Sequence, residues 1–151
     1  MKDVHVTPVV TVGAYSALDA VGGKLEFEDV CTPYSNSGII KQAHVSDKAK
    51  QLSLLYLVLF DQDFTATADN APFAVSDADL LNVVAVITFG VANYASFDAN
   101  AFATMGLVGI DVNMPFVLVE GGTSLFGQLY VVTSTPTYAS TSDLSVGLII
   151  E

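Results

Sequence analysis

The stretch Gln51-Leu-Ser-Leu-Leu-Tyr-Leu-Val-Leu-Phe60 decides the fold class, because it alternates as a β-strand does and is apolar on both faces. A strand with two apolar faces is buried on both of them. We therefore expect it at the centre of a sheet, or with one face against a neighbouring subunit. One face carries Leu52, Leu54, Tyr56, Val58 and Phe60, and the other carries Leu55, Leu57 and Leu59.

Short apolar stretches separated by turn residues lie on both sides of this strand. Residues 24–28 alternate, with Leu25 and Phe27 predicted to face inward. Residues 39–45 predict a further strand, and a regular period of two puts one set of side chains on each face. The first set is Ile39, Lys41, Ala43 and Val45, and the second is Ile40, Gln42 and His44.

The second half of the chain continues the pattern. Residues 61–76 form a long acidic loop, and Ser76 with Asp79 predicts the N-cap of one brief helix. The β-branched residues 83–88 favour a strand, and residues 90–114 are open to either a helical turn or an extended loop. Strands are predicted at 115–120 and 125–134, and the last strand, 144–150, has one apolar face made of Leu144, Val146, Leu148 and Ile150.

Eight or nine short strands with turns rich in Gly, Pro, Ser and Thr predict an all-β protein. The uneven strand spacing favours a jelly-roll-like antiparallel β-sandwich with one or two short helical turns over an up-and-down barrel. At 151 residues, we expect a single β-sandwich domain over 1–151.

Composition excludes several classes of protein. The chain has 16 acidic residues, five Lys and no Arg, a net charge of -11, and 52% apolar residues. Nucleic-acid binding needs clustered basic residues, and disorder needs low hydrophobicity. The most strongly apolar stretch, 80–92, is too short and too interrupted to span a membrane, and the first residues do not form a signal peptide. We expect a protein made and left unprocessed in the cytoplasm, with no nucleic-acid or membrane partner.

Charge is distributed unevenly along the chain. Every Lys lies in the first 50 residues, which sum to -1, whereas residues 51–151 hold ten acids and no base. One interpretation is a near-neutral contact surface and an acidic solvent-facing surface. The other is that surface acids simply keep an apolar protein dissolved. On the first interpretation the candidate contact residues are Lys24, Lys41, Lys48 and Lys50.

Few residues of the sequence suggest catalysis or metal binding. Neither histidine, His5 or His44, belongs to a catalytic motif, and the lone Cys31 is interpreted as a partly buried hydrophobic residue. The acidic residues of the 61–76 loop leave two alternatives, a Ca²⁺ site or a solvated loop. Those residues are Asp61, Asp63, Asp69 and Asn70. We expect no enzymatic activity and no cofactor.

Five stretches together resemble one family, the decoration (cement or auxiliary head) proteins of tailed-bacteriophage capsids. They are Tyr15-Ser-Ala-Leu-Asp-Ala-Val-Gly-Gly-Lys-Leu-Glu-Phe27, Ser37-Gly-Ile-Ile-Lys-Gln-Ala-His-Val-Ser-Asp-Lys48, Leu57-Val-Leu-Phe-Asp-Gln-Asp63, Ser76-Asp-Ala-Asp-Leu-Leu81 and Thr135-Pro-Thr-Tyr-Ala-Ser-Thr-Ser-Asp-Leu-Ser-Val146. The resemblance covers nearly the whole chain. The sequence departs from the family pattern at Leu18, where family members have Gly.

The resemblance implies a structural virion protein made in the host cytoplasm. Such a subunit is usually a homotrimer that binds the outer surface of the capsid and bridges capsomers of the major capsid protein. Candidate residues for the trimer interface or the core are Leu52, Leu54, Tyr56, Val58, Leu144, Val146, Leu148 and Ile150. The alternatives are another virion component, such as a head-fibre base or tail protein, or a ligand-binding β-module, for example for carbohydrate.

Overall fold

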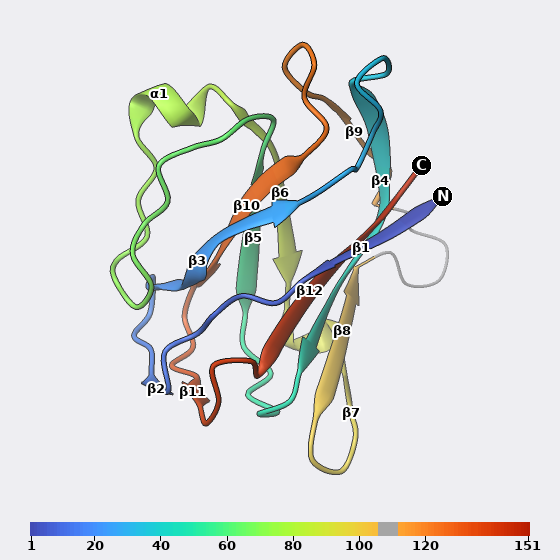
Figure 1. The fold of residues 1–151 in the computed structure, drawn as a ribbon. Helices are drawn as coiled ribbons and strands as arrows, with labels where there is room; N and C mark the ends of the chain where they lie inside the picture. Colours follow the sequence, from blue (N-terminus) through green and yellow to red (C-terminus); the bar gives the residue numbers. More distant parts are fainter. Residues whose placement is uncertain (106–111) are drawn as a thin grey trace.

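Two antiparallel sheets packed face to face form the body of the protein in a computed structural model, which describes residues 1–105 and 112–151. The first sheet has the order β1-β12-β4-β8-β7, with β9 also paired to β4, and the second has the order β3-β10-β5-β6 (Figure 1). These strands are β1 (Lys2–Val6), β3 (Ala20–Phe27), β4 (Ser37–Asp47), β5 (Leu55–Phe60), β6 (Val83–Phe89), β7 (Tyr94–Ser96), β8 (Ala101–Met105), β9 (Met114–Val117), β10 (Leu125–Val131) and β12 (Leu144–Ile150).

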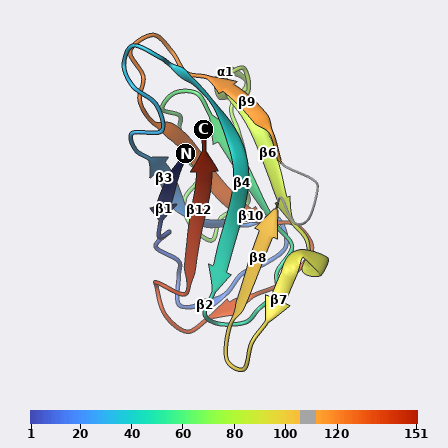
Figure 2. The same cartoon turned by 90° about the vertical axis from the view of Figure 1, so that its right-hand side faces the viewer.

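The strand order is that of a jelly roll. Without the short strands β7 and β9, the two sheets hold eight strands in the described residues, and they fall in chain order as 1-8-3-6 and 2-7-4-5. Strands β2 (Gly13–Ala14) and β11 (Thr137–Tyr138) pair separately. Figure 2 looks onto the first sheet, with both termini near its β1–β12 edge. The all-β sandwich predicted from the sequence is confirmed, with 49% strand and 5% helix.

The main core lies between the two sheets. Residues of β5 and β12 contribute heavily, because every second side chain of these strands points inward. Leu25 and Phe27 of β3 face inward as predicted. Four residues of β12, Leu144, Val146, Leu148 and Ile150, are at most 2% exposed and all belong to this core.

The position of β5 is central, as its two apolar faces predict. The strand itself begins at Leu55 and not at residue 51, because a turn precedes it. In that turn Lys50 and Leu52 both have a φ of 52°, and the buried Asp47 carboxylate accepts the backbone N–H groups of Ala49, Gln51 and Leu52 at 3.0, 2.7 and 3.0 Å. Leu52 and Leu54 therefore lie outside the strand and are half-buried.

The alternation predicted for β4 is correct after Lys41 and wrong before it, at Ile39 and Ile40. Ile40 lies in the core with Ala43 and Val45, whereas a regular period of two places it on the opposite face. The reason is a β-bulge: Ile150 pairs with Ile40 and Ile149 pairs with Gln42, so Lys41 is an extra residue. A single inserted residue exchanges the two faces of the strand on either side of it.

Helix is confined to two short segments in the described residues. They are α1 (Asp77–Leu80), where the Ser76 hydroxyl accepts the Asp79 N–H at 3.1 Å as predicted, and the 3-10 turn η1 (Val91–Asn93). Neither is long enough to cross a bilayer. Within 90–114, where the sequence left a helical turn or an extended loop open, the structure has the turn η1 and then a hairpin of β7 and β8. Residues 106–111, the later part of that stretch, lie outside the described residues.

Candidate functional site

The outer face of the second sheet is covered by the chain's own loop. Phe64, Phe73 and Val75 from the segment 61–76 pack on Val58 and Phe60 of β5 and form a second apolar cluster. The Phe64 and Phe60 rings stack with centroids 3.9 Å apart. This segment therefore occupies the face of β5 for which the sequence also allowed a neighbouring subunit.

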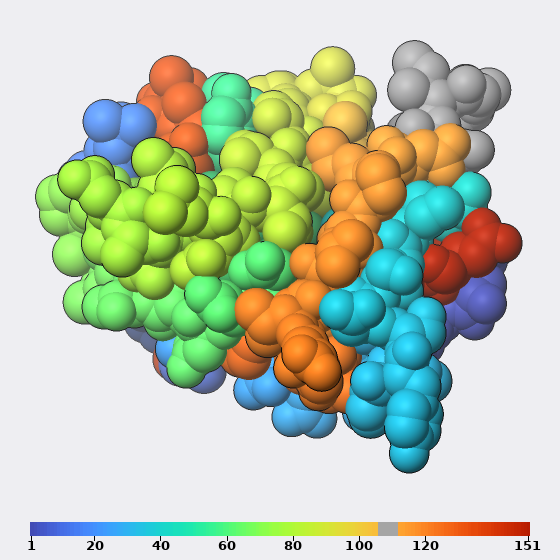
Figure 3. Space-filling model, turned by 90° about the horizontal axis from the view of Figure 1, so that it is seen from above, coloured from blue at the N-terminus to red at the C-terminus, as the bar shows by residue number. Residues whose placement is uncertain are grey.

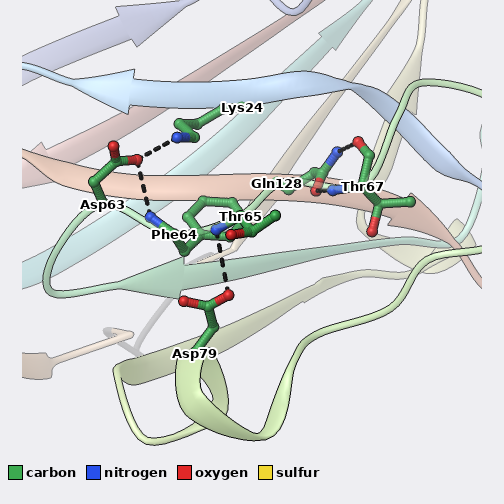
Figure 4. Close-up of polar contacts among 7 residues, drawn as sticks. All are labelled: Lys24, Asp63, Phe64, Thr65, Thr67, Asp79 and Gln128. Carbon is green, nitrogen blue, oxygen red and sulfur yellow. Dashed lines mark hydrogen bonds and ion pairs between the residues drawn. The ribbon is translucent and has the colours of Figure 1, made fainter.

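Polar contacts fasten this loop to the sheet, as Figure 4 shows. The fully buried Gln128 of β10 accepts the Thr67 N–H at 3.0 Å and donates to the Thr67 carbonyl at 2.6 Å. It also donates to the Gly22 carbonyl of β3 at 3.1 Å. Lys24 of β3 forms an ion pair with Asp63, and its Nζ lies 5.5 Å from the centroid of the Phe64 ring.

An open hollow lies at this seam, lined by Lys24, Asp63, Phe64, Thr65, Ala66 and Asp79. Its polar groups already bind one another: Lys24 pairs with Asp63, and the Thr65 N–H donates to Asp79 at 3.3 Å (Figure 4). Lys24 is the main cause that lowers the pKa of Asp63, through their hydrogen bond. The positive charge of Lys24 is paired with the Asp63 carboxylate. The lining of the hollow therefore has no unpaired positive charge that would attract an anionic ligand.

Three of the four acidic-loop residues weighed as a Ca²⁺ site make separate structural contacts, and the fourth, Asp61, has a buried carboxylate oxygen without a hydrogen-bond partner within the described part of the chain. Asp69 accepts hydrogen bonds from Thr11 Oγ1, Tyr15 Oη and Gly22 N at 2.6, 2.7 and 2.6 Å. Asp63 pairs with Lys24, while Asn70 donates weakly to the Ala14 carbonyl at 3.4 Å. Burial raises the pKa of the fourth residue, Asp61. In the described residues, Asp61, Asp63 and Asp69 do not bring their carboxylates close enough together to share a metal.

The candidate lysines lie at three separate places. Lys24 is on the second sheet, whereas Lys41 belongs to β4 of the first and pairs with Glu151 at 3.2 Å. Lys48 and Lys50 follow the other end of β4, where Lys48 is exposed and Lys50 donates to the carbonyls of Phe97 and Asp98 at 2.6 and 3.1 Å.

The two halves of the sequence do not form two separate surfaces. In both sheets, strands from the first 50 residues alternate with later strands: β1-β12-β4-β8 in one and β3-β10-β5 in the other. The interpretation of a near-neutral half and an acidic half as distinct faces is therefore wrong. Strands that are distant in sequence lie side by side in each sheet. The net charge of a sequence segment is therefore not the net charge of one surface.

Apolar side chains are exposed where β6 meets β9. Strand β6 is an edge of the second sheet and contacts β9 of the first. Seen from above, the yellow-green atoms of the α1–β6 segment lie beside the orange atoms of β9 (Figure 3). Five side chains on these elements and directly after them are at least 41% exposed: Leu80, Leu81, Val86, Val117 and Val119. We call these five residues the β6–β9 patch.

The sequence did not predict this patch, because the pattern of its residues indicates it only weakly. Val86 stands in a run of β-branched residues that predicts a strand but not its place in the sheet. Single exposed apolar residues are normal on protein surfaces, and only their clustering distinguishes a contact surface.

Comparison with known proteins adds no relative: neither a family model nor a curated protein matches the chain. The structure therefore defines the fold class: an all-β jelly-roll sandwich in which the loop 61–76 covers the outer face of the second sheet.

Proposed function

We propose that this protein is a capsid decoration protein, which binds the outer surface of a tailed-phage head as a homotrimer and strengthens contacts between capsomers of the major capsid protein. The observation that carries the structural part of the proposal is the β6–β9 patch. Exposed apolar side chains beside a sheet edge offer a surface for protein contact. The phage assignment rests on the sequence resemblance.

A second observation supports the resemblance. Leu18 has a φ of 72°, in the left-handed region that glycine adopts most readily. This is the position at which members of the decoration family have Gly. The backbone here thus has the geometry that the family residue would suit.

The structure changes which residues we assign to the trimer contact. The apolar faces of β5 and β12 are buried within one chain, so Val58, Leu144, Val146, Leu148 and Ile150 are not available to a partner. The β6–β9 patch is available, and we assign the subunit contact to it. Of the candidate capsid contacts, Lys48 is exposed in the turn after β4, whereas Lys41 and Lys50 bond within the chain, and we assign the capsid contact to Lys48.

Two measurements test the assignment of the patch. Light scattering coupled to size-exclusion chromatography should give a trimer for the purified chain, and Leu81→Ser combined with Val117→Ser should give a monomer. The control is Phe97→Ser, which removes an apolar side chain that is 57% exposed in the β7–β8 turn. Dissociation by the control, or an unchanged trimer in the double variant, would contradict the assignment.

Binding to expanded shells of the major capsid protein tests the function itself. We expect saturable binding that Lys48→Gln weakens and Lys24→Gln, which makes the same charge change on the other sheet, leaves unaltered. A chain that stays monomeric and does not bind shells would refute the decoration function. Labelling by electron microscopy distinguishes the alternative of a tail or head-fibre component, because decoration repeats over the head lattice.

A further inference from the structure

Two histidines meet on the outer face of the first sheet although their strands are not neighbours. His5 of β1 pairs with Gly147 of β12, and Gly147 pairs with His44 of β4, so the three residues form one row across the sheet. Strands two places apart lie about 10 Å from each other. Even so, His44 Nε2 lies 3.3 Å from His5 Nδ1.

Gly147 makes this contact possible. A Cβ atom at this position would lie 2.1 Å from His44 Nε2, so the histidine ring occupies the space that any other residue's side chain would fill. Because β12 carries no side chain at Gly147, the His44 ring can extend from β4 over β12 to β1. Phe102 of β8 stacks against His44 from the other side, with centroids 5.3 Å apart, and supports the ring in this position.

Asp3 completes the cluster. It lies two residues before His5 on the same face of β1, and its Oδ2 is 2.9 Å from His5 Nε2. When Nε2–H donates to this carboxylate, the lone pair of His5 Nδ1 is directed toward His44. His44 is 6% exposed, whereas the side chains of His5 and Asp3 are 52% and 53% exposed, so an ion can reach the cluster from solvent.

We propose that Asp3, His5 and His44 form a binding site for a divalent transition-metal ion of the Zn²⁺ class. Two imidazole nitrogens and one carboxylate are a donor set that suits Zn²⁺ and its neighbours better than Mg²⁺ or Ca²⁺. Among the residues the structure describes, this is the group of three or more potential ligands whose donor atoms come close enough, all within 4.8 Å of one another.

The distances fit a tetrahedral ion. Zn–N bonds of about 2.0–2.1 Å place two tetrahedral ligands about 3.4 Å apart. The two histidine nitrogens already stand 3.3 Å apart, so the ion would replace the hydrogen between them without movement of either strand. Asp3 would turn its exposed carboxylate from His5 Nε2 toward the ion, and water would take the remaining position.

Isothermal titration calorimetry of the untagged chain with zinc chloride tests the proposal. We expect one saturable site per chain. The variants His5→Gln and His44→Gln should each weaken zinc binding at least about tenfold, and Asp3→Asn about tenfold, since loss of a single coordinating or orienting group has effects of this size. Asp98→Asn, which neutralises another exposed acid, should bind zinc as the unaltered chain does.

A second measurement guards against variants that fail to fold. In the unaltered chain, zinc should shift the NMR resonances of both histidine rings together, and magnesium should not. The chain has only these two histidines, so the assignment is direct. Absence of saturable zinc binding would overturn the proposal, as would zinc affinity undiminished in His5→Gln and His44→Gln. Either result would leave the cluster as a hydrogen-bonded contact between strands, and neither bears on capsid binding.

Discussion

Leu18 is the residue at which local backbone geometry and side-chain chemistry conflict most clearly. Its φ is 72°, and its side chain is 56% exposed, so it gains little from packing to offset the unfavourable conformation. Its backbone is nevertheless fixed, because its N–H donates to the Val131 carbonyl at 2.9 Å and its carbonyl accepts from Phe73 at 2.8 Å. For L-residues this conformation costs roughly 1–2 kcal/mol, and glycine avoids the cost.

We predict that Leu18→Gly stabilises the protein by about 1 kcal/mol, measured as the free energy of unfolding in urea. The matched control is Phe97→Gly. Phe97 is 57% exposed, lies outside the β6–β9 patch and does not have a positive φ, so glycine there brings greater freedom to the unfolded chain without relieving strain and should destabilise. Equal effects at the two positions would contradict the backbone explanation.

At the scale of elements, the covering loop 61–76 is as much a part of the fold as the strands beneath it. Phe64 is the clearest contact: it is 6% exposed, stacks on Phe60, and carries Lys24 near its ring. Phe73 adds a second stacked pair with Tyr130, with centroids 4.5 Å apart. Without these rings the outer face of β5 would be an exposed apolar surface at the centre of a sheet.

We predict that Phe64→Ala lowers the free energy of unfolding by about 3 kcal/mol or more, the usual range for a buried phenylalanine. Phe97→Ala, at a side chain that is 57% exposed, should change it by less than about 0.5 kcal/mol. Chemical denaturation followed by circular dichroism measures both. If Phe64→Ala also increased binding of a hydrophobic dye to the native protein, the covered face would be the surface exposed.

Some features of these elements can be predicted from the sequence, and others cannot. The bounds of β12 and the cap of α1 follow from local patterns, which is why 144–150 and Ser76 are correct as predicted. The bulge at Lys41 is not visible in a period-of-two pattern, because it depends on the register with β12. The histidine cluster depends on Gly147, which lies more than a hundred residues from both histidines in sequence.

At the scale of the whole molecule, the ionisation of tyrosine side chains indicates whether the sandwich is folded. Burial is the largest cause that raises the pKa of Tyr15, Tyr94 and Tyr138 far above the ordinary value of 10.0. Tyr34, by contrast, is 99% exposed. A tyrosine whose pKa is raised in the folded state keeps its proton where the unfolded chain would release it.

Stability should therefore fall as pH rises above about 10, because only the unfolded chain gains from ionising these side chains there, and it should be unaffected by them below that pH. We predict that the near-ultraviolet absorbance of tyrosinate rises in two stages. The later stage belongs to Tyr15, Tyr94 and Tyr138, which ionise only with the loss of β-sheet circular dichroism. A single stage without unfolding would show that the three hydroxyls are accessible in the native state.

The pairing of β1 with β12 has a consequence for how the protein is made. Strand β1 lies at the edge of the first sheet and pairs with β12, which separates it from β4. On a growing chain, β1 has no partner, and β4 lacks its neighbour β12, until residues 144–150 have been synthesised. Assembly of the first sheet therefore waits for β12, and a chain arrested before residue 144 would present β1 without a partner and one edge of β4 open, a state prone to aggregation.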